Sequence, residues 1–121
     1  MEIYIGTDIV ENKRIQQAYE KYKDKFLTRI FTQKEIEYCL NKKEYIQCLS
    51  ARFAAKEATI KAYYQAFKEI LTFKQIEILG YKNQPAEILL HNIENHHNFK
   101  IKLSLSHEKK YSIATVIIYT A

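Results

Sequence analysis

The sequence predicts an α+β protein in which about three helices pack against an antiparallel sheet. An alternating pattern opens the chain, helical patterns follow as far as residue 67, and strand patterns fill the remainder. The 121 residues include only two glycines and one proline, too few for a linker or a low-complexity tract. We therefore expect a single domain over residues 1–121.

The first strand is expected over residues 2–10, where side chains alternate between two faces. Asp8 and Glu11 have the spacing of a capping box, so the first helix is expected to begin there with Asp8 as its N-cap. Apolar residues between Ile15 and Phe26 recur at helical spacing and give this helix an apolar face.

Two further helices follow in the sequence. Thr32 and Glu35 form a second capping box, in front of a helix that is expected to end near Leu40. The longest helix is expected over roughly residues 43–67, and it contains the segment RFAAKEATIKA (52–62).

Four more strands are expected in the second half of the chain, separated by short polar breaks: 72–79, 86–91, 99–106 and 111–120. The last two should form a hairpin. Both alternating sets of side chains in segment 111–120 are largely apolar, and a strand of this kind is covered on both faces. With only about three helices available, the second cover is expected to come from another copy of the chain.

The charge of the protein indicates an anionic partner. The net charge is +5 and the sequence pI is about 9.1, a balance that attracts nucleic acid, phosphorylated metabolites or an acidic protein. Residues 11–31 hold six lysines and arginines against three acidic residues, so this segment carries +3 of the total.

We expect a cytoplasmic protein without membrane contact. No apolar run approaches the roughly 20 residues that span a bilayer, and Met1 is followed by a strand-like segment rather than a signal peptide. Cys39 and Cys48 lack paired metal-ligand spacing and are expected to be buried or half-buried thiols, which suits a reducing compartment.

The segment RFAAKEATIKA places Phe53, Glu57 and Lys61 along one line of its helix. Taken alone, Glu57 and Lys61 form a solvated ion pair that contributes about 0.2–0.5 kcal/mol. Arg52 and Lys56 add positive charge on a neighbouring row. Small side chains form the adjacent row and let another backbone or a ligand approach closely: Ala54, Ala58 and Ala62.

Asp8 has two interpretations. A helix N-cap needs no further role. A strand-to-helix junction is also a common place for functional groups, and one carboxylate there could bind Mg²⁺ together with a carboxylate on the long helix. Mg²⁺ is usually held by one or two carboxylates, with waters and substrate phosphates as its other ligands.

The segment SLSHE (104–108) has two different faces. Leu103, Leu105 and His107 continue an apolar face, on which His107 would be a half-buried core histidine. The opposite face is expected either to hold a phosphate or simply to be the solvated side of the strand. It carries lysines and hydroxyls: Lys100, Lys102, Ser104 and Ser106.

Four segments in this order resemble the holo-acyl-carrier-protein synthase family, the small bacterial trimeric 4′-phosphopantetheinyl transferases: GTDIVENKRI (6–15), FTQKEIEYC (31–39), RFAAKEATIKA (52–62) and SLSHE (104–108). The resemblance covers nearly the whole chain. It implies the 4′-phosphopantetheinyl transferase fold and a homotrimer with active sites between neighbours. It also implies transfer of 4′-phosphopantetheine from coenzyme A to a serine of apo-acyl carrier protein for fatty acid biosynthesis, with Mg²⁺ and release of adenosine 3′,5′-bisphosphate.

The resemblance also implies roles for individual residues. Asp8 and Glu57 would be the metal ligands, and Lys61 would face the pyrophosphate of coenzyme A. Three residues match positions near the nucleotide end of the donor: Arg52, Ser106 and His107. The base that takes the proton of the serine would be Glu57 itself or a water bound to the metal. The acidic carrier would dock on the basic first helix, at Arg14, Lys21, Lys23 and Lys25.

The chain departs from the family in two loops. Residues 63–67 read YYQAF where the family has a glycine-containing turn, and glycine would allow closer approach to a phosphate. The family's Gly-Lys-Pro appears as Asn83-Gln84-Pro85, in which Asn83 would take the unusual backbone angle. Neither departure touches the proposed metal ligands.

Two other functions fit parts of the sequence. A small basic nucleic-acid-binding protein is favoured by the pI and the ten tyrosines, but base stacking needs exposed aromatic rings, and most tyrosines here lie on apolar stripes. We therefore expect no nucleic acid partner. A non-catalytic trimeric scaffold is the second alternative, and Asp8, Glu57 and Lys61 argue against it.

Overall fold

A computed structural model of the protein describes residues 1–80, 84–93 and 98–120. Its elements are β1 (Glu2–Glu11), α1 (Asn12–Tyr22), α2 (Asp24–Ile30), α3 (Gln33–Leu40), α4 (Tyr45–Phe67), a 3₁₀ turn η1 (Phe73–Gln75), β2 (Ile76–Leu79), β3 (Glu87–Leu90), β4 (Phe99–His107) and β5 (Tyr111–Thr120).

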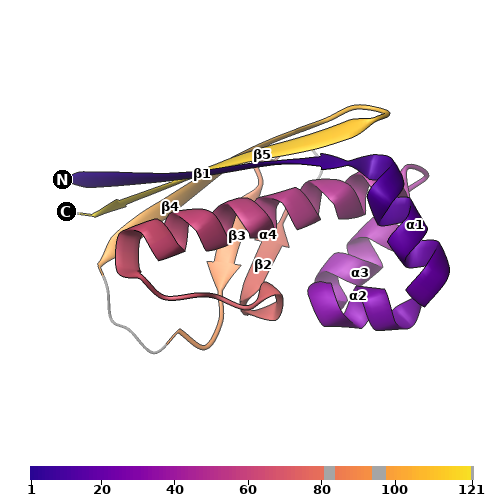
Figure 1. Cartoon of the computed structure of the whole chain (residues 1–121), viewed down its shortest axis with the longest axis horizontal. Helices are drawn as coiled ribbons and strands as arrows, with labels where there is room; N and C mark the ends of the chain where they lie inside the picture. The colour runs from indigo at the N-terminus through magenta and orange to yellow at the C-terminus, as the bar shows by residue number, and fades with distance from the viewer. Residues whose placement is uncertain (81–83, 94–97, 121) are drawn as a thin grey trace.

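The long helix α4 lies between two layers of β structure (Figure 1). On one side is an antiparallel sheet with strand order β1-β5-β4, and on the other is the antiparallel pair β2-β3. Helices α1 to α3 gather at one end of α4. The α+β class and the β4–β5 hairpin are confirmed, although the described strands form two sheets rather than one.

The alanine row of α4 lets the backbone of β1 approach closely. Ala54, Ala58 and Ala62 are fully buried. A Cβ atom built on Gly6 would lie 2.0 Å from the carbonyl oxygen of Ala58, so only a glycine fits at this crossing. Of the two roles expected for the small residues, the approach of another backbone is the one that the structure contains.

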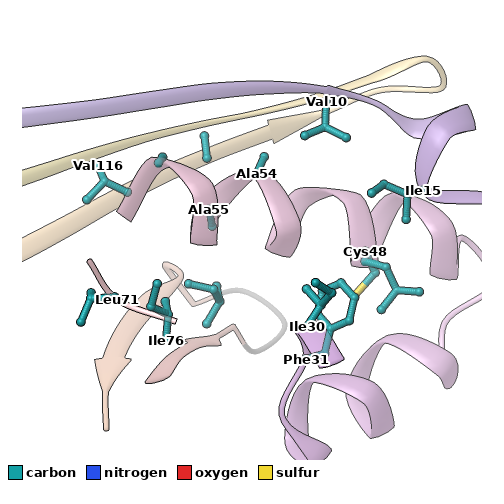
Figure 2. Packing of buried hydrophobic residues seen from close by; sticks show 14 of the residues in the cluster. Val10, Ile15, Ile30, Phe31, Cys48, Ala54, Ala55, Leu71, Ile76 and Val116 are labelled. Carbon is teal, nitrogen blue, oxygen red and sulfur yellow. The ribbon is translucent and has the colours of Figure 1, made fainter. Parts of the chain in front are cut away.

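The core surrounds α4, as expected for a helix with a layer on each side. Figure 2 shows Val10 and Val116 of the sheet above the helix, and Leu71 and Ile76 below it. In the part of the chain that the structure describes, no helix is both long and apolar enough to cross a membrane.

The first helix begins later than the sequence predicts, and Asp8 does not cap it. Strand β1 continues to Glu11, which pairs with Tyr111, and Asp8 pairs with Ala114 inside the ladder. Glu11 is the N-cap of α1 and makes no side-chain capping bond. The capping-box prediction is wrong here because a distant strand extends the pairing of β1 past Asp8.

The first helical segment is also broken in two. Lys23 has a positive φ of 51°, and its N–H donates to the carbonyl of Tyr19 to close α1. Its own carbonyl accepts the N–H groups of Phe26 and Leu27 and so starts α2. The described chain therefore has four α-helices, not three.

The capping box of Thr32 and Glu35 is confirmed at the start of α3. A similar box between Thr72 and Gln75 forms the turn η1, so the strand expected over 72–79 begins only at Ile76.

Cys39 and Cys48 are buried, but the prediction that they are free thiols is wrong. They form a disulfide between the end of α3 and the first turns of α4, with their Cα atoms 5.4 Å apart. The short connection between the two helices brings the residues within the distance that a disulfide requires.

The close contact at Gly6 predicts that one added methyl group would strongly destabilise the protein. We expect Gly6→Ala to lower the free energy of unfolding by about 3 kcal/mol, because the new Cβ meets backbone atoms that cannot move independently. Gly80→Ala is the matched control, since its Cβ would lie 3.3 Å from the end of the Arg52 side chain, which can shift more easily than backbone atoms. Urea unfolding of both variants measures the difference, and equal losses would contradict the interpretation.

Candidate functional site

The first cluster of candidate residues lies where β1 crosses α4. Asp8 comes two residues after Gly6 and therefore points to the same side of the strand, toward the helix. The Lys61 ammonium lies 3.2 Å from Oδ1 of Asp8 and donates to the carbonyl of Thr7 at 3.0 Å. Among the described residues, Lys61 thus makes its ion pair across to the strand rather than along the helix to Glu57.

The neighbouring charges shift the pKa of Glu57. Partial burial raises the pKa of the Glu57 carboxyl, and the neighbouring Asp8 carboxylate raises it further. The Lys61 ammonium opposes the shift. A carboxylate whose pKa is raised in this way binds a proton or a metal ion more readily than a carboxylate on an open surface.

A cavity of about 420 Å³ opens beside the two carboxylates. Its wall carries Asp8 and Glu57, the guanidinium-bearing Arg14 and the ring of Phe53. The remaining lining residues are apolar: Ile9, Val10, Ile15, Ala18 and Phe26. Arg14 is thereby placed next to the carboxylates, while the three basic residues that follow it lie exposed on α1, α2 and the turn between them: Lys21, Lys23 and Lys25.

A second cavity of about 520 Å³ contains Arg52 and His107. The Arg52 guanidinium is buried, which lowers its pKa, and it lies 4.5 Å from the centre of the Tyr38 ring. His107 is exposed rather than half-buried in the core as predicted, and its Nδ1 is 2.9 Å from Oε1 of Gln47. Two lysines of the loop before α4 complete the basic wall: Lys42 and Lys43.

Ser106 lies apart from both cavities. It pairs with Ile113 on the face of the sheet that turns away from α4. The two cavities share no lining residue. The residues expected at one active site therefore occupy three places on a single chain.

Lys56, which the sequence interpretation took only as an added positive charge beside the Glu57 row, has a structural role that was missed. Its side chain is fully buried, pairs with Glu35 at 2.8 Å, and donates to the carbonyls of Phe73 and Ile76. Burial lowers the pKa of Lys56, while Glu35 opposes that change. The pair ties α3 and the β2 layer to α4.

The structure describes the first of the two segments in which the chain departs from the family. Residues 63–67 continue α4, and the buried Tyr63 packs its ring against Phe67 and Phe99. Lys68, with a φ of 58°, closes the helix. The expectation for Asn83 lies outside the described residues.

Two carboxylates with a lysine beside them, between a strand and a long helix, are typical of proteins that act on phosphate groups. The model of the 4′-phosphopantetheinyl transferase superfamily matches residues 4–116, and the chain therefore belongs to this superfamily. This confirms the resemblance that the four segments indicated.

Relatives from several bacteria agree with the family. The holo-acyl-carrier-protein synthase of Aquifex aeolicus is 46% identical over 117 residues, 94% of this chain and 96% of the relative. That of Chloroherpeton thalassium is 43% identical over 115 residues, 94% and 95% of the two chains. A structure of the Helicobacter pylori enzyme in complex with coenzyme A matches with a TM-score of 0.74 at 28% identity, covering 95% of this chain and 99% of the other.

The two lysines of α4 should differ sharply in their effect on stability. Lys56→Met would leave the Glu35 carboxylate buried without its partner and should cost about 3–5 kcal/mol of unfolding free energy. Lys61→Met removes a partly exposed pair and should cost less than about 1 kcal/mol. Chemical denaturation of both variants checks this, and a mild effect of Lys56→Met would contradict the interpretation that the pair ties α3 to α4.

Proposed function

We propose that this protein is a holo-acyl-carrier-protein synthase, which transfers 4′-phosphopantetheine from coenzyme A to a serine of apo-acyl carrier protein in fatty acid biosynthesis. The observation that carries the proposal is the meeting of the Asp8 and Glu57 carboxylates at one cavity, with the Lys61 ammonium paired to Asp8. The names of the relatives and the coenzyme A bound to the Helicobacter pylori enzyme support it.

The reaction forms a bond between the serine oxygen of the carrier and the β-phosphorus of coenzyme A. The bond from this phosphorus to the bridging oxygen breaks, and adenosine 3′,5′-bisphosphate leaves. The serine must lose its proton, and the proposed base is Glu57 itself or a water bound to the metal. Lys61 would stabilise the negative charge on the phosphate oxygens.

The donor set at Asp8 and Glu57 fits Mg²⁺. The charge of Asp8 raises the pKa of Glu57, and a cation between the carboxylates would relieve this repulsion. Within the described residues there is no group of three or more histidine, cysteine or acidic ligands, so Mg²⁺ would depend on water and phosphate oxygens as well. When bound, Mg²⁺ would supply neutralisation of the phosphate charge.

We propose that the nucleotide end of coenzyme A binds near Arg52 and His107. Arg52 is buried, and its Nε has no hydrogen-bond partner among the described residues. A buried guanidinium of this kind suits a phosphate. Because this cavity is separate from that of Asp8 and Glu57, we expect a complete active site to combine the first cavity of one protomer with the second cavity of a neighbour.

The face of the β1-β5-β4 sheet that turns away from α4 also supports a homotrimer. In Figure 1, α4 covers only one face of β1, β5 and β4. The other face exposes large apolar side chains: Ile3, Ile5, Ile9, Tyr111, Ile113 and Ile117. A patch of this size marks an interface, and a second copy of the chain presents a patch of the same kind. Ser106 lies on this face and would reach the neighbour's donor.

The cytoplasmic location expected from the sequence stays a prediction. The Cys39–Cys48 disulfide removes the argument that free thiols gave for a reducing compartment.

The decisive test is to incubate the protein with apo-acyl carrier protein, coenzyme A and Mg²⁺ and to weigh the carrier by mass spectrometry. Glu57→Gln and Asp8→Asn should each nearly abolish the gain in mass while the circular dichroism spectrum stays unchanged. Gln65→Ala on the same helix serves as a control that leaves the carboxylates intact. Near-normal transfer by both carboxylate variants would reject the metal assignment.

The trimer predicts opposite effects at adjacent residues of β5. Ile117 is on the open face, so Ile117→Lys should yield folded monomers with little activity. Val116 is fully buried against α4, so Val116→Lys should unfold the protein. Light scattering and circular dichroism separate the two results. A monomeric mass for active wild-type protein would contradict the shared site.

If the acidic carrier docks on the basic first helix, a change there should affect the KM values of the two substrates differently. Arg14→Glu should raise the KM for the carrier strongly and the KM for coenzyme A only slightly, and added salt should weaken carrier binding because exposed charges are screened beyond about 8 Å. Lys21, Lys23 and Lys25 should each contribute less, about 0–1 kcal/mol. Steady-state kinetics with each substrate varied decides the matter. Equal effects on both KM values would assign Arg14 to the donor site.

A further inference from the structure

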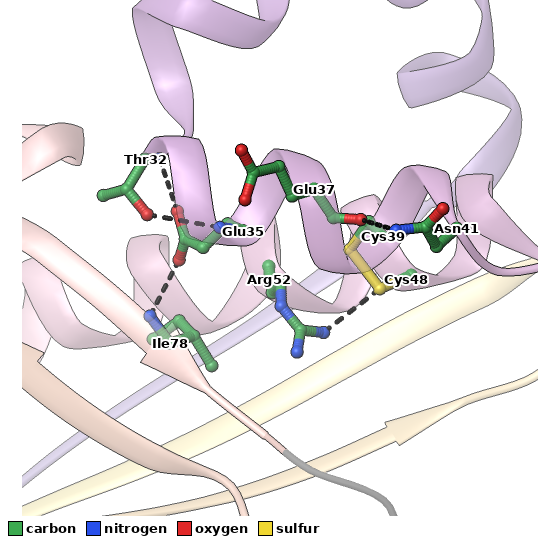
Figure 3. Close-up of a disulfide and its surroundings, with 8 residues drawn as sticks. All are labelled: Thr32, Glu35, Glu37, Cys39, Asn41, Cys48, Arg52 and Ile78. Carbon is green, nitrogen blue, oxygen red and sulfur yellow. Dashed lines mark hydrogen bonds between the residues drawn. A yellow bond between two sulfur atoms is a disulfide. The ribbon is translucent and has the colours of Figure 1, made fainter.

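The disulfide lies against the second cavity and touches one of its charged residues. Cys48 lines the cavity together with Arg52 and His107. Nη1 of Arg52 lies 3.3 Å from Sγ of Cys48, one helical turn away on α4, and Figure 3 shows the guanidinium directed at the sulfur. The partner sulfur, on Cys39, is fully buried behind it.

The same disulfide holds together the aromatic and cationic groups on this wall. Tyr38 precedes Cys39 on α3, and its ring lies 4.5 Å from the Arg52 guanidinium and 4.5 Å from the Lys42 ammonium. Lys42 belongs to the loop that the disulfide closes. The covalent link between α3 and α4 therefore fixes the spacing of three groups that face the cavity.

The guanidinium makes this disulfide open to exchange. A positive charge next to a cysteine favours the thiolate over the thiol, which stabilises the reduced form and makes Cys48 a better leaving group. Cys48 lines the cavity and keeps 6% of its surface exposed, while Cys39 is fully buried, so a reagent in the cavity meets the disulfide from the Cys48 side.

We propose that Cys39–Cys48 is a site of thiol–disulfide exchange with a dithiol reductant, and that its state sets the affinity of the adjoining cavity for a nucleotide. A thiolate of the reductant attacks Cys48, the sulfur–sulfur bond breaks, and Cys39 leaves and takes up a proton. The second thiol of the reductant gives its proton to water and attacks the reductant's own sulfur in the mixed disulfide, and Cys48 leaves as a thiolate beside Arg52. Two electrons pass to the protein, and the reductant becomes a disulfide.

Reduction would weaken nucleotide binding for two reasons. The Arg52 charge becomes partly neutralised by the Cys48 thiolate, and α3 with Tyr38 is no longer tied to α4. This consequence rests on the proposed function, since it takes the cavity as the site for the nucleotide of the donor.

The test compares the oxidised protein with the same protein reduced by dithiothreitol. Adenosine 3′,5′-bisphosphate is the probe because it has no thiol, and calorimetry measures its affinity. We expect about tenfold weaker binding by the reduced form, comparable to the loss of one charge-assisted contact. Mass spectrometry after alkylation, with two added groups per reduced chain, verifies each state. The double variant Cys39→Ser, Cys48→Ser should bind like the reduced form and ignore dithiothreitol.

A separate measurement tests the exchange chemistry. In Cys39→Ser, alkylation of Cys48 as a function of pH gives the pKa of its thiol, which should rise when Arg52→Gln is added. Equal affinities of the two forms, or no rise with Arg52→Gln, would overturn the proposal. No binding by either form would reject the nucleotide site and the affinity effect, while the alkylation results would still decide whether exchange occurs.

Discussion

The close crossing of β1 over α4 at Gly6 is the constraint on which the candidate site depends. The strand can approach because Gly6 has no Cβ and because alanines face it from the helix. Two residues further along the strand, Asp8 reaches the charged row of α4 that carries Glu57 and Lys61. A wider separation of strand and helix would break the Asp8–Lys61 ion pair and move Asp8 away from Glu57.

Helix α4 packs against both β layers because its sides carry different kinds of side chain. Its alanine face takes the sheet, and its opposite side takes the buried Glu35–Lys56 pair and the β2 layer. Glu57 and Arg52 leave the helix toward different cavities. One rigid element thus positions both sets of candidate residues, in cavities that share no lining residue.

Local signals in the sequence predicted local structure well. The capping box at Thr32, the last hairpin and the alanine row depend on neighbouring residues, and the structure contains all three. The approach of Asp8 to the long helix followed from its family motif. Three features that the sequence did not predict share one cause, since pairing of β1 with β5, burial of Lys56 and the meeting of two cysteines depend on residues distant in sequence or on tertiary packing.

The edge strand β1 also has a consequence for the order in which the chain folds. Its only hydrogen-bonded neighbour among the described strands is β5, so Glu2 finds its partner, Thr120, at the far end of the sequence. During synthesis the first strand must wait until nearly the whole chain has left the ribosome. Until then the alanine face of α4 lacks the cover that β5 gives it. The high contact order slows this last step and makes the nascent chain depend on protection from aggregation.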